Sequence, residues 1–217
     1  MKNTRYTLLV FDWDGTLIDS ETKIIAMFHA ACDEIGVTRR QDADIRNIIG
    51  LGLPIAIQTL FPEQNARNRD RILTGYRHHF DATPASALFP GVPETLILLR
   101  EQGFRMGIAT GKSRRGLEKD LSDTGLREWF PVTRCADEAP SKPHPGMLYG
   151  IMEEIACAPK NTLMIGDTEH DLKMARNAGV DAVAAAYGVQ GREHLLQWEP
   201  RAYLDAIPEL IDWLMES

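Results

Sequence analysis

Four short apolar segments, alternating with segments of helical period, constrain the fold of this chain most. The apolar segments are residues 7–11, 105–109, 162–165 and 181–184. Apolar residues recur at helical spacing in 92–102, 113–124, 146–157 and 168–178. Short buried strands that alternate with helices predict a parallel sheet covered by helices. Ligands of such sheets bind at the carboxyl ends of the strands, so the residues that follow the apolar segments are candidate site residues.

Residues 20–82 differ from the rest of the chain because they contain no convincing strand. Their apolar residues recur at helical spacing in 22–35, 53–61 and 66–80, which predicts helices. We therefore expect an α/β fold with a Rossmann-like parallel sheet core. The expected core domain comprises residues 1–17 and 86–217, and an all-helical domain of residues 18–85 is inserted into it.

The first apolar segment runs directly into Asp12-Trp13-Asp14-Gly15-Thr16. Side chains at i and i+2 of a strand share a face, so the Asp12 and Asp14 carboxylates begin on one side. Like charges this close are costly, and a hard cation such as Mg²⁺ relieves that cost by binding their oxygens. The pattern predicts a metal site with a nucleophile beside an acid/base. Asp and Gly also suit an ordinary strand-ending turn.

Thr110 and Gly111 follow the second apolar segment and precede a helical one. A hydroxyl and free backbone amides at such a turn can hold phosphate oxygens. The same two residues also suit a plain turn. We expect the next residue, Lys112, to be a solvated side chain.

Lys142 lies among prolines, just before a segment of helical period. A lysine fixed there would place a cation against a phosphate in the transition state, although single lysines are ordinarily exposed. His144, flanked by two prolines, is expected to be a surface or turn histidine.

Asp167 follows the third apolar segment, and Asp171 comes four residues later. One helical turn separates them, so both carboxylates can reach the same side of a pocket. They equally suit the acidic first turn of a helix. Glu169 and His170 are expected to be solvated helix residues.

Together these segments resemble the four motifs of the haloacid dehalogenase superfamily, in the order that the superfamily uses. Residues 12–16 resemble its DxDGT motif, Thr110 its Ser/Thr motif, Lys142 its lysine motif and residues 166–171 its GDxxxD motif. The resemblance spans about residues 6–188. The helical insertion resembles the helical cap of the phosphoglycolate phosphatase-like group.

The resemblance implies a phosphatase that hydrolyses a small organic phosphate monoester. Asp12 would attack phosphorus and form an aspartyl phosphate. Asp14 would protonate the leaving group and then deprotonate the attacking water. Thr110, Gly111 and Lys142 would bind the transferring phosphoryl group.

The same resemblance implies Mg²⁺ as the cofactor. Its ligands would be the Asp12 carboxylate, the Asp14 backbone carbonyl and Asp167. Asp171 would be a supporting acidic residue near the metal or Lys142. Mn²⁺ would suit the same oxygen ligands.

The helical cap would exclude water and contact the part of the substrate that is not phosphate. Gly50 and Gly52 form a turn where backbone could approach a ligand, and a plain helix-helix turn is an equal alternative. Arg46, His78 and His79 are candidates for contacting an anionic leaving group, although a solvated helix face is the expected role of each.

The substrate itself stays open among phosphoglycolate, pyrophosphate, nucleoside monophosphates and sugar phosphates. A sugar phosphomutase is the nearest alternative activity. A phospho-accepting or phosphate-binding module is a more distant one, because it would not need a helical lid. Haloacid dehalogenases as a family lack the second aspartate, and Asp14 is present here.

Composition excludes several other classes. The net charge of -7 over 217 residues argues against nucleic acid as a partner. No apolar run approaches a membrane span, and the four consecutive apolar residues of 8–11 are too few for a signal-peptide core. Three widely spaced cysteines imply neither a disulfide framework nor a zinc site. We expect a cytoplasmic protein with a small-molecule substrate; monomer and homodimer remain undecided.

Overall fold

The computed structural model describes residues 4–216, and its centre is one parallel sheet. Within those residues six strands lie in the order β3-β2-β1-β4-β5-β6. The strands are β1 (Leu8–Phe11), β2 (Arg105–Ala109), β3 (Val132–Arg134), β4 (Thr162–Gly166), β5 (Asp181–Ala185) and β6 (Tyr203–Leu204). The four predicted strands are confirmed. Strands β3 and β6 were not predicted, because three and two residues are too short to show a pattern.

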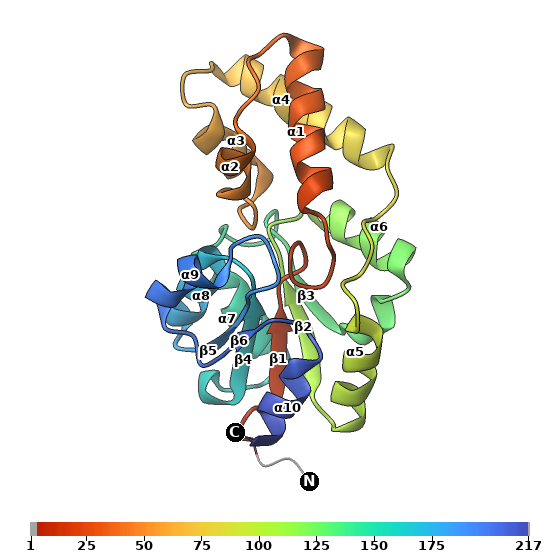
Figure 1. Cartoon of the computed structure of the whole chain (residues 1–217), viewed down its shortest axis with the longest axis vertical. Coiled ribbons are helices and arrows are strands. Elements are labelled where there is room, and N and C mark those ends of the chain that lie inside the picture. The colour runs from red at the N-terminus through yellow and green to blue at the C-terminus, as the bar shows by residue number, and fades with distance from the viewer. Residues whose placement is uncertain (1–3, 217) are drawn as a thin grey trace.

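Some helices connect these strands, and others form a separate group beyond the carboxyl ends of the strands (Figure 1). The helices are α1 (Glu21–Ile35), α2 (Asp42–Arg46), α3 (Leu53–Leu60), α4 (Ala66–Asp81), α5 (Val92–Glu101), α6 (Arg114–Thr124), α7 (Gly146–Ile155), α8 (Glu169–Ala178), α9 (Arg192–Leu195) and α10 (Glu209–Glu216). All seven predicted helical segments are present; α2, α9 and α10 were not predicted.

Helices cover both faces of the sheet, because strand side chains alternate between the faces. Leu9 and Phe11 of β1 pack with apolar residues of α5, α6 and α10. Leu8 and Val10 pack on the opposite face with residues of α7 and α8. A strand buried on both sides is therefore apolar at every position, and all four β1 residues have an exposed fraction of 0%.

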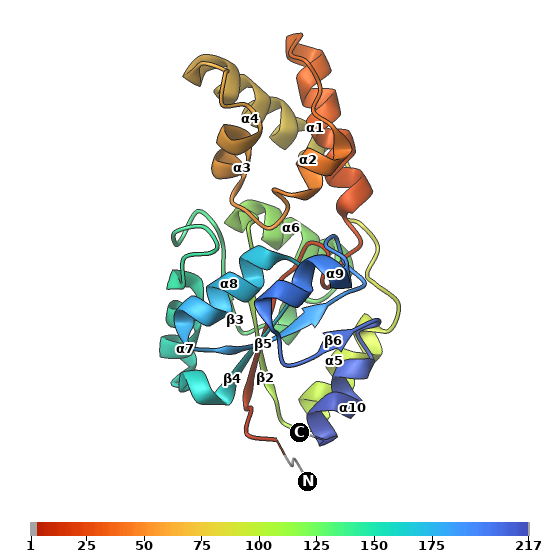
Figure 2. The same ribbon diagram turned by 60° about the vertical axis from the view of Figure 1, so that its left-hand side comes forward.

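The helices α1–α4 form their own apolar cluster beyond the carboxyl end of β1 (Figures 1 and 2). Phe28 of α1 contacts Tyr76 of α4, with ring centroids 4.8 Å apart. Gly75 allows close packing there, since a Cβ at this position would lie 3.3 Å from the Cβ of Ala31. The expected α/β fold with an all-helical insertion is confirmed. The boundaries at residues 17/18 and 85/86 stay predictions.

Among the described residues, no helix combines the length and the apolar character that a membrane crossing requires.

Candidate active site

Asp12 lies directly after β1 and is 1% exposed. Its Oδ1 accepts hydrogen bonds from the Trp13 amide at 2.6 Å and pairs with Lys142 Nζ at 2.8 Å. Its Oδ2 is buried and has no hydrogen-bond partner among the described residues. A buried carboxylate oxygen without a partner is costly, so this oxygen is available to a ligand or a reacting atom.

Lys142 is a buried cation rather than an exposed one, and it lies beside Asp12. Its side chain is 0% exposed, and Nζ lies 2.8 Å from Asp12 Oδ1 and 2.6 Å from Asp171 Oδ1. Burial alone would lower the pKa of Lys142, but the two carboxylates reverse this and raise it above the ordinary value. Lys142 therefore stays charged beside Asp12.

Asp171 is fixed by the helix that carries it. Its Oδ2 accepts hydrogen bonds from the Thr168 amide at 3.2 Å and the Thr168 hydroxyl at 2.7 Å, as part of the capping box that begins α8. Its other oxygen binds Lys142. Asp171 therefore positions the lysine, which agrees with the supporting role expected of it.

Asp167 lies at the end of β4, against the turn that follows Asp14. It accepts hydrogen bonds from the Thr16 hydroxyl at 2.8 Å and the Val189 amide at 2.9 Å. Gly15 has a φ of +80°, and a Cβ there would collide with the Asp167 carboxylate. The glycine of the first segment thus serves both a left-handed turn and the close approach of this carboxylate.

Three of the predicted acidic residues can share a cation. Ligand oxygens of Asp12, Asp167 and Asp171 lie within 4.8 Å of one another. Burial, with Asp171 as the next cause, raises the pKa of Asp167 to about 7 and also raises the pKa of Asp12. Three buried carboxylates with only Lys142 paired to two of them carry excess negative charge, which fits a hard divalent cation held by oxygen ligands.

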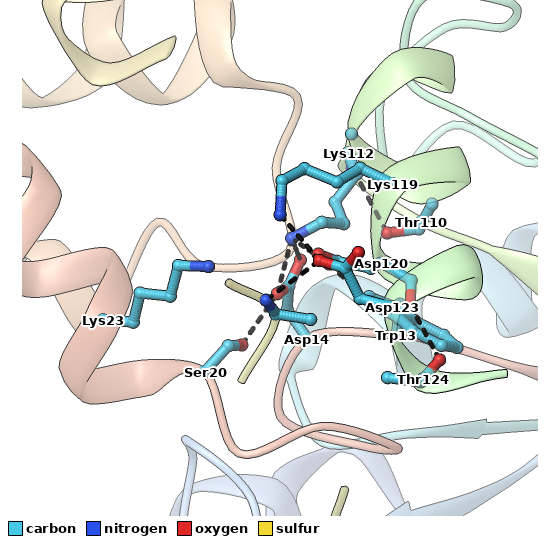
Figure 3. A network of polar contacts seen from close by, with 12 residues as sticks. Trp13, Asp14, Ser20, Lys23, Thr110, Lys112, Lys119, Asp120, Asp123 and Thr124 are labelled. Atoms are coloured by element: carbon cyan, nitrogen blue, oxygen red, sulfur yellow. Dashed lines mark hydrogen bonds and ion pairs between the residues drawn. The ribbon is translucent and has the colours of Figure 1, made fainter. Parts of the chain in front are cut away.

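Asp14 belongs to a second polar group, which it forms with Ser20, Lys112 and Asp120 (Figure 3). Its Oδ1 accepts hydrogen bonds from Ser20 Oγ at 2.7 Å and Lys112 Nζ at 3.0 Å. The expectation that Lys112 is solvated was wrong, because its side chain is only 11% exposed. Burial alone would lower the pKa of Lys112, but Asp14 and Asp120 raise it above the ordinary value.

Asp120 of α6 was missed by the sequence reasoning. It is 1% exposed and lies 3.0 Å from Lys112 Nζ and 3.0 Å from Trp13 Nε1. The signal was an aspartate on the apolar side of a helix, beside Leu117 and Leu121 at i-3 and i+1. A carboxylate on a buried helix face needs a cation or a donor.

Thr110 and Gly111 lie together at the end of β2. Thr110 is fully buried, and its hydroxyl accepts a hydrogen bond from the Lys112 amide at 3.2 Å. A Cβ on Gly111 would lie 2.5 Å from the carbonyl oxygen of Gly50 and 2.6 Å from that of Leu51. Only glycine allows the loop after α2 to approach this closely.

A cavity of about 180 Å³ lies between the carboxyl ends of the strands and the helices α1–α4. Its lining brings Asp12, Asp14, Gly111 and Lys112 together with apolar side chains of the helices. Gly50 also lines it, as the turn prediction allowed. Thus the sheet supplies polar groups and the helical insertion supplies a mostly apolar wall.

Arg46, His78 and His79 are not among the residues that line this cavity. Arg46 pairs with Glu21, and His79 lies 3.4 Å from Glu34, both within the helical segment. These contacts agree with a role on a helix face.

His170 departs from the expected solvated role. It is partly buried, and its Nε2 lies 3.1 Å from the carbonyl oxygen of Asn47. Burial lowers the pKa of His170. This contact joins α8 to the loop after α2.

Comparison with known proteins agrees with the geometry. The family model described as haloacid dehalogenase-like hydrolase matches residues 9–185. Pyrophosphatase PpaX of Halalkalibacterium halodurans is 32% identical over 207 residues, 94% of each chain. Phosphoglycolate phosphatase of Nitrosococcus oceani is 27% identical and covers 97% of each chain. A solved haloacid dehalogenase-like family protein of Streptococcus pneumoniae superposes with a TM-score of 0.83 at 23% identity, covering 96% of this chain and 98% of the other.

Proposed function

Because the chain belongs to the haloacid dehalogenase-like hydrolases, we propose that it hydrolyses a small organic phosphate monoester through an aspartyl phosphate on Asp12. The family and the phosphatase names of its relatives confirm the predicted enzyme class, a phosphoric monoester hydrolase. Phosphoglycolate-like esters are the proposed substrates, and pyrophosphate is a close alternative in view of the relative named for it.

The observation that carries this proposal is the state of the Asp12 carboxylate. One oxygen is held by Lys142 and the Trp13 amide, while the other is buried without a partner among the described residues. A nucleophile needs one oxygen fixed and one free to attack. The cavity reaches Asp12 from the side of the helical insertion, so a substrate can approach from there.

The proposed sequence divides the work between the two polar groups. Asp12 Oδ2 attacks phosphorus, and Asp14 gives a proton to the leaving oxygen. Asp14, now ionised, then removes a proton from a water molecule, and the water oxygen attacks phosphorus. The bond between phosphorus and Asp12 breaks, phosphate leaves, and the Asp12 carboxylate and the protonated Asp14 are restored. Lys142, the Thr110 hydroxyl and the Gly111 amide would stabilise the phosphoryl oxygens as negative charge moves over them.

Asp12 and Asp167 would hold Mg²⁺, together with the Asp14 backbone carbonyl. When bound, Mg²⁺ offsets the charge between the nucleophile and the phosphate. Asp171 would act on this site indirectly, because its two oxygens already bind Lys142 and Thr168.

We propose that the helical segment, residues 18–85, acts as a cap that excludes water and contacts the leaving group. The proposed partner is a small-molecule phosphate, with neither nucleic acid nor membrane involved. A cytoplasmic location is also proposed. Its support is the three cysteines, Cys32, Cys135 and Cys157, which are unpaired in the described residues.

The test is phosphate release from a panel of phosphate esters and pyrophosphate, with and without Mg²⁺. Asp12→Asn is compared with Asp205→Asn, a matched change at a side chain that is 70% exposed. We expect Mg²⁺-dependent release that Asp12→Asn abolishes and Asp205→Asn leaves unchanged. Phosphate transfer between sugar positions without release would instead favour a phosphomutase. Absence of turnover on the whole panel would refute the phosphatase.

A further inference from the structure

Lys112 places a cation next to the proposed acid, at the point where a leaving group would depart. Its Nζ lies 3.0 Å from Asp14 Oδ1 and 3.2 Å from Oδ2, and Lys112 lines the cavity. An oxygen that accepts a proton from Asp14 must lie within hydrogen-bond distance of that carboxylate. Atoms of the leaving group next to this oxygen therefore come within reach of Lys112.

Asp120 holds the Lys112 ammonium in place. Asp120 Oδ2 lies 3.0 Å from Lys112 Nζ and also accepts a hydrogen bond from Trp13 Nε1 at 3.0 Å. Trp13 is fully buried between the two aspartates of the first segment. The three side chains point toward one another in Figure 3, so the ammonium is held in place before any substrate binds.

The ammonium keeps hydrogen-bonding capacity for a ligand. A lysine has three N–H donors, and Lys112 has two carboxylate partners among the described residues, Asp14 and Asp120, so a third donor can be directed to a ligand. The nearby wall is apolar, with the Phe80 ring centroid 4.8 Å from Nζ and Phe28 lining the same cavity. Charge interactions are stronger in such low-polarity surroundings than in water.

The carboxylates of Asp14 and Asp120 alone would repel an anion, but Lys23 of α1 adds a second positive charge nearby. Its side chain extends toward the same group (Figure 3), and its Nζ lies 4.9 Å from the Phe80 ring centroid. Its hydrogen bond goes to the Pro84 carbonyl, and it has no carboxylate partner among the described residues. The positive charges of Lys23 and Lys112 thus offset the negative charges of Asp14 and Asp120, so the net charge of these four side chains is zero.

We propose that Lys112 is a specificity residue that selects substrates whose leaving group carries its own negative charge, a carboxylate or a second phosphate. The inference rests on the proposed phosphatase function and narrows its substrate class. Asp120 would be a positioning residue that holds Lys112 through the contact described above. The cavity volume of about 180 Å³ further favours a small leaving group.

The experiment compares kcat/KM for paired substrates that differ in leaving-group charge. One pair is 2-phosphoglycolate and its neutral amide, which tests a carboxylate; the other is pyrophosphate and methyl phosphate, which tests a second phosphate. We expect the wild type to prefer the charged member of at least one pair by about 10- to 100-fold, the effect of one hydrogen bond to a charged group. The pair that shows the larger preference identifies the source of the charge.

In Lys112→Met this preference should fall to within about threefold of unity, mainly through a higher KM for the charged substrate, while Lys112→Arg retains most of it. Asp120→Asn should weaken the preference with the lysine still present, which a purely structural role of Asp120 would not do. Lys119→Met is the matched control, because Lys119 lies on α6 next to Asp120 but pairs with Asp123. The control should keep the wild-type ratio.

Two results overturn the inference without touching the phosphatase assignment. One is that the wild type hydrolyses both members of each pair equally. The other is that Lys112→Met changes both members by the same factor and so keeps the wild-type ratio. The double variant Lys112→Met with Asp120→Asn removes an unpaired buried carboxylate, so the ratio can be measured even if the single variant unfolds. Absence of turnover by the wild type would refute the proposed function itself.

Discussion

Two buried lysines, Lys142 and Lys112, are each paired with two aspartates and differ in what surrounds them. Lys142 binds Asp12 and Asp171 within the core, and its side chain is 0% exposed. Lys112 binds Asp14 and Asp120 at the wall of the cavity, and its side chain is 11% exposed. The same chemistry therefore serves two ends of one proposed reaction. In that proposal Lys142, enclosed in the core, would stabilise the nucleophile, and Lys112, on the cavity wall, would meet the leaving group.

The largest expected effect comes from removing the enclosed cation. Lys142→Met should lower kcat by about 10²- to 10³-fold, because one fixed donor to the phosphoryl oxygens is lost. The free energy of unfolding should also fall by about 3–5 kcal/mol near pH 8, since Asp12 and Asp171 lose their partner. Steady-state kinetics and chemical denaturation measure the two effects. A kcat within tenfold of the wild type would show that the two lysines do not differ as argued.

The second prediction tests the carboxylate that faces Lys112. Asp14→Asn should slow hydrolysis of alkyl phosphates by about 10²-fold or more, because the leaving alkoxide loses its proton donor. Hydrolysis of p-nitrophenyl phosphate should suffer less, since nitrophenolate leaves without a proton. The ratio of the two rates is the measurement. An equal loss on both substrates would mean that Asp14 acts on the nucleophile's side, like the Lys142 group.

The contrast between the lysines also shows how far the sequence could predict the site. Prolines, a helix start and the order of the four segments all pointed to Lys142, and the structure brings it to 2.8 Å from Asp12. Lys112 had no such local signal. Its partner Asp120 lies eight residues on, and only the folded α6 brings that carboxylate under the lysine. Buried charge pairs between elements depend on tertiary packing, which local sequence patterns do not reveal.

The same distinction applies to the fold. Strands β1, β2, β4 and β5 were predictable because burial on both faces makes them mostly apolar, apart from polar first residues in β2, β4 and β5. Strands β3 and β6 pair at the sheet edges over three and two residues, where only the neighbouring strand defines them. The contact of His170 with Asn47 was not predictable either, because it depends on how the loop after α2 sits on the core.

A third prediction concerns how the backbone places Lys112. Gly111→Ala puts a methyl group 2.5 Å from the Gly50 carbonyl oxygen, so the loop and the residue after Gly111 must move. We expect kcat/KM to fall about tenfold, as for a small displacement of catalytic groups. Gly191→Ala is the control, because a Cβ there meets nothing within 4 Å. Equal activity of the two variants would show that this close approach does not position the cavity wall.

The smallest expected effect is a pH dependence of stability, which distinguishes the carboxylates around Lys142 from those around Lys112. In the metal-free protein, burial and then the charge of Asp171 raise the pKa of Asp167 from its ordinary value of about 4 to about 7. Between about pH 4 and 7 the folded state therefore binds more protons than the unfolded state, and stability falls as the pH rises through this window. Mg²⁺ should reverse the loss above pH 7, since it binds ionised carboxylates. Melting temperatures at pH 5.5 and 8, with and without Mg²⁺, measure this as shifts of a few degrees, on the order expected for 1 kcal/mol.

Asp167→Asn should flatten the pH dependence and abolish the Mg²⁺ effect. Asp120→Asn should preserve both, because Asp120 lies with Lys112 and outside the group of carboxylates that can share a cation. If Asp120→Asn removed the Mg²⁺ effect instead, the metal would lie on the Lys112 side and the assignment of the two groups would have to be exchanged.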